Sequence, residues 1–237
     1  MSDNRSAENE HAGRVREMFA TIARRYDLLN HLLSVNIDKR WRRVVAERIA
    51  GKIKLDGARI LDVACGTGDL AATLFEVTGA EIVATDFCRP MLDIASDKIG
   101  HDVTLIESDA LRLPFQDGSF DAVTIGFGLR NLANVQRGLA ELGRVLRSGG
   151  SLAVLEFSRP ANGAVRVVFG TYFTRILPVM GGIVSGSRGA YTYLPDSVKR
   201  FPDQRELLAM IEEAGFKEVS FENLTGGIAA LHVGRKP

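Results

Sequence analysis

The sequence predicts an α/β protein built on a doubly wound, mostly parallel sheet of seven strands. Short apolar runs alternate with helical segments from residue 59 onward, and a Gly66-x-Gly68 loop joins the first run to its helix. Alternation of this kind indicates βαβ units and a parallel sheet. The last two apolar runs leave no room for a crossover helix between them, so we expect the sheet to end in an antiparallel C-terminal hairpin.

Each element follows from its local pattern. The apolar runs that predict strands are residues 59–64, 81–85, 103–107, 120–125, 151–156, 217–223 and 228–235. Helical spacing of apolar residues predicts helices at 69–75, 89–99, 135–146 and 203–214. Glycines punctuate these elements, with Gly149-Gly150 before the fifth strand and Gly215 after the last helix.

The chain divides into three segments. Residues 1–13 are polar and mixed in charge, which predicts a disordered tail. Residues 14–56 have helical periodicity and form an expected helical cap, and residues 57–237 form the main domain. An insertion at 158–201 breaks the strand and helix rhythm and is rich in glycine, aromatic and aliphatic residues. Long insertions in compact domains are usually functional, so we expect it to cover a substrate at the carboxyl edge of the sheet.

Composition excludes several classes of protein. The 237 residues are 46% hydrophobic and 25% charged, which excludes a disordered chain. A net charge of +1 is too balanced for a dedicated nucleic-acid binder. The two cysteines, Cys65 and Cys88, cannot form a disulfide framework, which favours a reduced, cytoplasmic protein. No apolar run reaches the roughly 18 residues of a membrane span, and the N-terminus lacks the apolar core of a signal peptide.

Positive charge is concentrated near the N-terminus. Residues 14–54 contain eleven Lys or Arg and four Asp or Glu, a local balance of +7. Such a stretch is either a solvated basic face on helices that pack beside the core, or a surface that meets anionic lipid or an anionic substrate. Both interpretations remain open from the sequence.

The loop after the first strand indicates a cofactor with an adenosine group. Gly66 and Gly68 permit a tight turn and a close approach of the backbone to a ligand, and the following helix adds exposed N–H donors. Asp86 follows Gly66 by twenty residues, at the end of the next strand, where a carboxylate accepts hydrogen bonds from ribose hydroxyls. The glycine pattern alone is a weak signal.

Asp62 discriminates between two cofactors. A nicotinamide dinucleotide would bring an anionic pyrophosphate to this loop, close to the Asp62 carboxylate, which is unfavourable. S-adenosyl-L-methionine has no phosphate and carries a sulfonium and an ammonium, which suit a nearby carboxylate. Asp62 therefore favours S-adenosyl-L-methionine, although it could instead bond the loop itself.

Asp109 supports the same cofactor. It follows the third strand, where its carboxylate can accept a hydrogen bond from the exocyclic amine of adenine while the N–H of Ala110 faces the ring. Cys65 is a small residue in a crowded loop, with no neighbouring His or Glu in the sequence to activate it as a nucleophile.

Taken together, these motifs resemble those of the menaquinone/ubiquinone biosynthesis C-methyltransferases, within the class I S-adenosylmethionine-dependent methyltransferases. The matching motifs are residues 19–30 (FATIARRYDLLN), Leu33-Ser34, Trp41, residues 63–69 (VACGTGD), Asp86, Asp109-Ala110, residues 113–115 (LPF), Phe120-Asp121, residues 126–131 (GFGLRN), residues 144–150 (RVLRSGG), residues 191–197 (YTYLPDS) and Phe201-Pro202. The chain departs from the family at Asn36, Asp38 and Ser148, where members usually carry Gly, His and Pro.

The resemblance implies a Rossmann-like class I methyltransferase fold over residues 57–237. It implies cofactor contacts at Thr67, Asp86, Asp109, Ala110 and Gly126, with S-adenosyl-L-homocysteine as product. It also implies a polyprenylated quinol substrate, either demethylmenaquinol or 2-methoxy-6-polyprenyl-1,4-benzoquinol. The change to Asp38 puts any family role of that position in doubt.

Methylation of a ring carbon needs a group that stabilises or generates a phenolate. Arg130 is always protonated, so we expect it to stabilise the phenolate, with Asn131 fixing a water or the quinol oxygen. Tyr26, on the cap, can bond the ring oxygen, and Asp27 is expected to orient Arg130. The competing explanation is structural: Tyr26 and Asp27 pack as a pair on a helix, and Arg130 forms a salt bridge that holds its loop. No cluster with the spacing of metal ligands occurs in the sequence.

Other functions remain as alternatives. They are another small-molecule or lipid O- or C-methyltransferase, an NAD(P)-binding oxidoreductase, and a non-catalytic scaffold. An RNA methyltransferase is disfavoured because no strongly basic extra domain is present. We expect a cytoplasmic protein with peripheral contact to the inner face of the cytoplasmic membrane, where the isoprenoid tail resides, and no nucleic-acid partner. Formation of a homodimer is left open.

Overall fold

The computed structural model describes residues 2–34, 36–160, 163, 170 and 188–237. Its strands are β1 (Arg59–Val63), β2 (Glu81–Asp86), β3 (Val103–Glu107), β4 (Phe120–Gly126), β5 (Leu146–Phe157), β6 (Lys217–Leu224) and β7 (Ala229–Arg235). Its α-helices are α1 (Ser2–Ser34), α2 (Ile37–Ala50), α3 (Asp69–Thr78), α4 (Arg89–Ile99), α5 (Val135–Val145), α8 (Arg188–Arg200) and α9 (Gln204–Glu213). Two short 3-10 turns, η1 (Leu129–Asn131) and η3 (Thr225–Gly227), complete the described elements.

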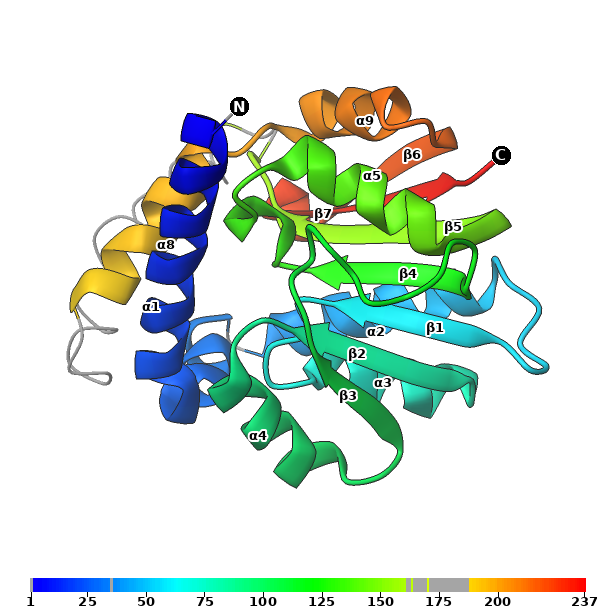
Figure 1. Cartoon of the computed structure of the whole chain (residues 1–237), viewed down its shortest axis with the longest axis horizontal. Coiled ribbons are helices and arrows are strands. Elements are labelled where there is room, and N and C mark those ends of the chain that lie inside the picture. Colours follow the sequence, from blue (N-terminus) through cyan, green and yellow to red (C-terminus); the bar gives the residue numbers. More distant parts are fainter. Residues whose placement is uncertain (1, 35, 161–162, 164–169, 171–187) are drawn as a thin grey trace.

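The predicted sheet is confirmed. Seven strands lie in the order β3-β2-β1-β4-β5-β7-β6 (Figure 1). The five strands from β3 to β5 are parallel, and β7 runs antiparallel to both β5 and β6. The strand order reverses beside β1, which lies between β2 and β4, and open α/β sheets bind ligands at such a point.

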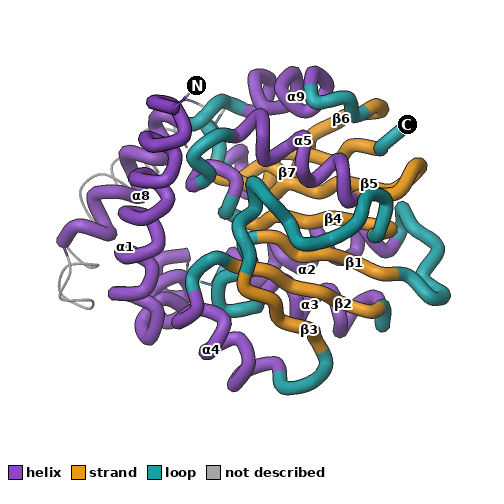
Figure 2. The backbone as a smooth tube through the Cα atoms, viewed as in Figure 1, coloured by secondary structure: helices purple, strands orange, loops and turns teal. Residues whose placement is uncertain are grey.

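Helices cover both faces of the sheet (Figure 2), and the central strands β1, β2 and β4 are buried at nearly every residue. Apolar side chains of α2 and α3 pack on one face with β1 and β2, and those of α5 and α9 pack on the other face with β4 and β5. β4 is buried along its length up to Gly126. This rigid sheet fixes the ends of β1 and β4, where the candidate site lies.

Several boundaries differ from expectation, most of them by a single residue, and the largest shifts are the end of α3, at Thr78 instead of residue 75, and the start of β5. β5 begins at Leu146, five residues before the apolar run expected from Ser151, because Leu146 already pairs with Phe120. The expected helix at 135–146 ends one residue early for the same reason. The helix expected at 203–214 begins with a capping box, in which the Asp203 carboxylate accepts backbone N–H groups and Glu206 bonds back to the N–H of Asp203.

The expected disordered tail is the largest difference. Residues 2–13 form the beginning of α1, which lies across one end of the sheet (Figure 1). Glu8 pairs with Arg137 at 2.6 Å, and the His11 Nε2 lies 3.3 Å from the Asn131 carbonyl oxygen. These partners are distant in the sequence, so the local composition could not predict them.

Most of the 158–201 insertion lies outside the described residues. Its described end is α8, which contacts α1 and the η1 turn (Figure 1). Within the described parts of the chain, no helix has both the length and the hydropathy needed to cross a membrane.

Candidate active site

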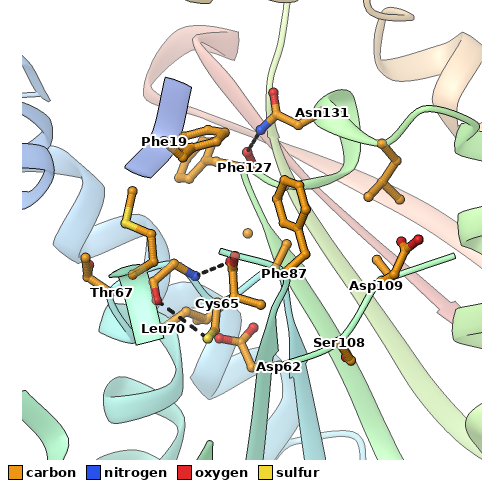
Figure 3. Close-up of a pocket in the computed structure, with 18 of the residues that line it drawn as sticks. Phe19, Asp62, Cys65, Thr67, Leu70, Phe87, Ser108, Asp109, Phe127 and Asn131 are labelled. Atoms are coloured by element: carbon orange, nitrogen blue, oxygen red, sulfur yellow. Dashed lines mark hydrogen bonds between the residues drawn. The ribbon is translucent and has the colours of Figure 1, made fainter. Parts of the chain in front are cut away.

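A pocket opens at the carboxyl ends of β1, β2, β3 and β4 and is covered by α1. Its empty space, including the part open to solvent, is about 1040 Å³. Figure 3 shows Asp62 and Asn131 at opposite ends of this pocket, with Thr67 and Asp109 on opposite sides. Ala12, Phe19 and Tyr26 of α1 also line it.

The loop between β1 and α3 has the backbone that its glycines predict. Ala64, Gly66 and Gly68 all have positive φ angles, of 53°, 56° and 82°. A Cβ on Gly68 would lie 2.2 Å from the flexible Cδ1 end of Ile99 and 3.2 Å from the Ala95 Cβ, and the positive φ would strain any other residue whatever the space, so glycine suits this close approach to α4. The loop therefore lies tightly against the protein and leaves the pocket side open.

Asp62, near the end of β1, has a carboxylate with one unused oxygen. Its side chain is fully buried, and Oδ1 accepts a hydrogen bond of 2.7 Å from the Thr124 hydroxyl. Oδ2 has no hydrogen-bond partner among the described residues. Burial raises the pKa of Asp62 from 3.8 to about 7, against the opposing charge of Arg42. An unpaired buried carboxylate oxygen is costly and needs an explanation, such as a catalytic role or a water, ion or ligand that binds there.

Asp86, at the end of β2, braces the glycine loop. Oδ2 accepts the Gly66 N–H at 2.8 Å, and Oδ1 accepts the Cys88 N–H at 2.9 Å. Burial raises the pKa of the Asp86 carboxyl, and these backbone N–H bonds oppose the rise. A ribose hydroxyl, which Asp86 is expected to bind, therefore has to bond to carboxylate oxygens that already accept the N–H groups of Gly66 and Cys88.

The segment after β3 forms the side of the pocket opposite Thr67 (Figure 3). Asp109 is exposed, and its Oδ1 accepts the N–H of Leu111 at 2.9 Å. Ala110 is buried beside it, and both residues line the pocket. Ser108 has a buried hydroxyl with no partner among the described residues, a second unused polar group that the sequence did not indicate.

The end of β4 approaches the glycine loop closely. A Cβ on Gly128 would lie 2.6 Å from that of Ala64, and a Cβ on Gly126 would lie 3.1 Å from Leu70 Cδ2. Phe127, between these glycines, has a positive φ of 57°. Gly126 and Phe127 both line the pocket.

Asp27 does not orient Arg130, contrary to the expectation. Its carboxylate accepts a hydrogen bond from the Thr67 hydroxyl and pairs with Lys98 at 2.5 Å. Lys98 also pairs with Asp69 at 2.6 Å. Asp27 therefore ties α1 to the glycine loop through the neutral Thr67 hydroxyl and to α4 through the ammonium of Lys98.

Arg130 is not on the pocket wall formed by the described residues. Its side chain is 6% exposed, and Nη1 lies 2.9 Å from Glu156 Oε2 and 2.5 Å from the Phe127 carbonyl oxygen. Its guanidinium carbon lies 5.3 Å from the centre of the Phe157 ring, within range of a cation–π interaction. No pattern in the sequence pointed to Glu156, which lies within the apolar run of β5.

Asn131 does line the pocket, as does Tyr26. The Asn131 Nδ2 donates to the Phe127 carbonyl at 3.3 Å, and its Oδ1 accepts the Tyr193 hydroxyl of α8 at 3.1 Å. These two bonds fix the orientation of the Asn131 amide at the end of the pocket opposite Asp62 (Figure 3). Burial raises the pKa of Tyr193, so this hydroxyl stays a donor at neutral pH.

Comparison with known proteins agrees with this geometry. A sequence model of the ubiE/COQ5 methyltransferase family matches residues 6–236. The chain is 53% identical to the protein named Demethylmenaquinone methyltransferase from Thermus thermophilus, over 93% of this chain and 100% of that one. It is 42% identical to the Ubiquinone/menaquinone biosynthesis C-methyltransferase UbiE of Geotalea uraniireducens, over 96% of this chain and 98% of that one.

Solved structures show the same fold at low identity. The [4+2]-cyclase SpnF superposes with a TM-score of 0.69 at 20% identity, over 94% of this chain and 95% of that one. A SAM-dependent methyltransferase from Aquifex aeolicus gives a TM-score of 0.57 at 20% identity, over 80% of this chain and 88% of that one. Since a cyclase and a methyltransferase share this architecture, these likenesses speak for the fold alone.

Proposed function

The chain belongs to the ubiE/COQ5 methyltransferase family, and from this premise we propose that it methylates a ring carbon of a polyprenylated quinol in respiratory quinone biosynthesis. The methyl donor in this proposal is S-adenosyl-L-methionine. The structural observation that carries the proposal is the buried Asp62 carboxylate on the pocket wall, whose Oδ2 has no hydrogen-bond partner within the described structure.

The residues of the pocket fit this donor. An ammonium group is a hydrogen-bond donor that satisfies Asp62 Oδ2 and compensates its charge. The pyrophosphate of a dinucleotide would instead add negative charge beside Asp62 and Asp86, both of which are buried. When bound, S-adenosyl-L-methionine supplies a methyl group activated by a positively charged sulfur.

We assign donor contacts to the predicted residues around the loop. Asp62 binds the ammonium, and Thr67 contacts the donor from the loop. Each carboxylate oxygen of Asp86 has a further lone pair that accepts a ribose hydroxyl while the bond to the loop is kept. Support for these roles comes from their shared pocket wall.

The adenine contacts are proposed for the opposite wall and the end of β4. Asp109 accepts the exocyclic amine, Ala110 meets the ring, and Gly126 leaves room for the donor because it has no side chain. These positions lie around one continuous pocket (Figure 3), which supports assigning them to one ligand.

The quinol is proposed to bind near Tyr26 and Asn131. Tyr26 approaches from α1, and Asn131 presents an amide fixed by Phe127 and Tyr193. Such fixed polar groups orient the ring oxygen and hold the acceptor carbon in line for transfer. Arg130 acts as a positioning residue, because its contacts with Glu156 and the Phe127 carbonyl hold the turn that carries Asn131.

Among the quinols, we propose demethylmenaquinol as the substrate. The relative with 53% identity is named Demethylmenaquinone methyltransferase, and so is a second from Deinococcus radiodurans with 50% identity. Relatives named for both ubiquinone and menaquinone keep 2-methoxy-6-polyprenyl-1,4-benzoquinol as the second candidate.

A peripheral contact with the membrane is part of the proposal, since the isoprenoid tail resides there. Its support is the basic stretch at 14–54, in which Lys39, Arg40, Lys52 and Lys54 are exposed. Co-sedimentation with vesicles containing anionic lipid at low salt tests this contact. Absence of binding with and without quinol would remove it from the proposal.

A turnover assay tests the function itself. Purified protein, S-adenosyl-L-methionine and a short-tailed demethylmenaquinol should yield the ring-methylated menaquinol, with the new carbon–methyl bond located by mass spectrometry. The benzoquinol is run in parallel to rank the two substrates. Methylation on oxygen, or no methylation of either quinol by protein that binds the donor, would contradict the proposal.

A further inference from the structure

Arg42 is a buried cation on the wall of the pocket that the roles assigned above do not use. It lies in α2, its residue is 8% exposed, and it lines the same pocket as Asp62. Its Nη1 pairs with the Asp38 carboxylate one helical turn earlier and lies 3.4 Å from Asp69 Oδ2. A buried guanidinium in this position needs a physical explanation beyond packing.

The guanidinium has donors to spare. Among the described residues, both ion pairs of Arg42 use Nη1, whereas a guanidinium carries five N–H donors in a planar fork. Asp38 holds one side of this fork, and α2 presents Asp38 in its first turn, where a negative charge is favourable. The remaining donors are thus available for a second carboxylate, which a guanidinium binds with particular specificity.

Arg42 is close enough to Asp62 for their charges to interact, since Arg42 opposes the rise in the pKa of Asp62. The pocket wall therefore presents a carboxylate with an unused oxygen and, near it, a guanidinium with unused donors. These two groups are complementary to the ammonium and the carboxylate of an amino acid. Acidic neighbours outnumber the cations here, which suits a ligand with two positive groups and one negative group.

We propose that Arg42 binds the α-carboxylate of the methionyl group while Asp62 binds its α-ammonium. Asp38 is the positioning residue that directs Arg42 toward the ligand. This inference rests on the proposed function and names how the amino-acid end of the donor is recognised. It also gives Asp38, which replaces the usual His of the family, a role in this chain.

The test compares two ligands that differ only at the amino-acid end. S-adenosyl-L-homocysteine and 5′-methylthioadenosine are both neutral thioethers of adenosine, but only the first has the amino-acid group. Calorimetric titration of each ligand gives the affinity contributed by that group. The variants are Arg42→Ala and Asp38→Asn, with Arg43→Ala as the matched control, since Arg43 is exposed and pairs only with Glu47 and Glu76 in the described structure.

Arg42→Ala should weaken binding of S-adenosyl-L-homocysteine by about 10- to 100-fold, the range of a hydrogen-bonded charge pair. Binding of 5′-methylthioadenosine should change by less than about twofold, because it lacks the carboxylate. Asp38→Asn should give a smaller loss of the same selective kind, and Arg43→Ala should leave both affinities unchanged. Equal loss for both ligands, or no loss, would overturn the role of Arg42.

Two further results distinguish a failure of the proposed function from a failure of the inference about Arg42. If the unaltered protein binds neither ligand, the proposed function fails, whereas binding without the selective loss overturns only this inference. A thermal melt reports whether Arg42→Ala folds, since it removes the guanidinium that pairs with the buried Asp38 carboxylate. If it does not fold, the double variant Arg42→Gln with Asp38→Asn removes both charges, and the same selective loss is required of it. Unchanged affinities in Asp38→Asn would overturn the positioning role of Asp38.

Discussion

Arg130 and Glu156 form an ion pair in the interior of the protein, with 2.9 Å between Nη1 and Oε2 and both side chains at most 6% exposed. Glu156 also accepts the backbone N–H of Arg130 at 3.1 Å, so one carboxylate bonds both the backbone and the guanidinium of the same residue. The pair joins β5 to the turn after β4, and that turn carries Asn131 to the pocket. The geometry of the quinol end of the site therefore depends on a contact outside the pocket.

Arg130→Ala should abolish quinol methylation while donor affinity stays within a few-fold. It should also lower the free energy of unfolding by about 3–5 kcal/mol, because Glu156 is left as an unpaired buried charge. Denaturant unfolding, calorimetric titration and a turnover assay measure the three effects.

The double variant Arg130→Ala with Glu156→Gln separates stability from function. It should recover much of the lost stability, since no buried charge remains, but not the turnover. Near-normal turnover in either variant would show that the turn does not need Arg130.

Asp62→Asn should stabilise the unliganded protein at pH 8 by an amount of order a few kcal/mol. Burial raises the pKa of Asp62 to about 7 in the folded state, whereas the unfolded state releases its proton near 3.8. Stability is thus lost as the pH rises from about 4 to 7, because only the unfolded state gains a charge without cost. Asparagine can still accept the Thr124 hydroxyl and carries no charge.

Thermal or denaturant unfolding of both proteins across pH 4 to 8 checks this sign. The two stabilities should be similar near pH 4, where Asp62 is neutral in both states, and diverge toward pH 7 and above. A difference that is constant across this range would mean that the carboxylate is not the cause.

Local pattern was enough to predict the sheet and the loop, but not the partners of charged residues. Gly66, Gly68 and Asp86 follow strands in a regular order, so their meeting at one edge follows from parallel topology. Arg130 and Asp27 were expected to pair with each other. Instead, Arg130 pairs with Glu156 of β5, and Asp27 pairs with Lys98 of α4. Which ion pairs form depends on distances in the folded structure, and the periodicity of the sequence carries no information about these distances.

The same limit explains the helix at residues 2–13. Its composition is that of a tail, and its contacts with Arg137 and Asn131 span more than 100 residues of sequence. The Thr124 hydroxyl that bonds Asp62 was missed for a related reason, since a threonine in a buried strand is indistinguishable from a packing residue.

Lys98→Met should loosen α1 from the glycine loop without unfolding the protein. Lys98 pairs with Asp27 and Asp69, but it is about one-third exposed, so its loss should cost at most about 1 kcal/mol. Hydrogen exchange should become faster in α1 around Asp27, and the donor should dissociate faster because α1 covers the pocket. Mass spectrometry of exchange and stopped-flow release measure these rates.

Arg14→Ala is the control, because Arg14 pairs with Glu10 on the same exposed face of α1. It should change neither rate appreciably. Equal acceleration in both variants would assign the effect to the helix itself rather than to its attachment.

Tyr193→Phe should reduce turnover about tenfold while affinity for S-adenosyl-L-homocysteine is unchanged. The Tyr193 hydroxyl holds Asn131 Oδ1 at 3.1 Å, at the end of the pocket far from Asp62 (Figure 3). Loss of one such bond costs up to about 1.4 kcal/mol, which is a factor of ten, and here the loss affects the orientation of the amide. A double-mutant cycle with Asn131→Ala decides whether Tyr193 affects turnover through its hydrogen bond to Asn131. In the Asn131→Ala background, Tyr193→Phe should have almost no further effect on turnover, and a full tenfold loss there would mean that Tyr193 acts on the substrate by another path.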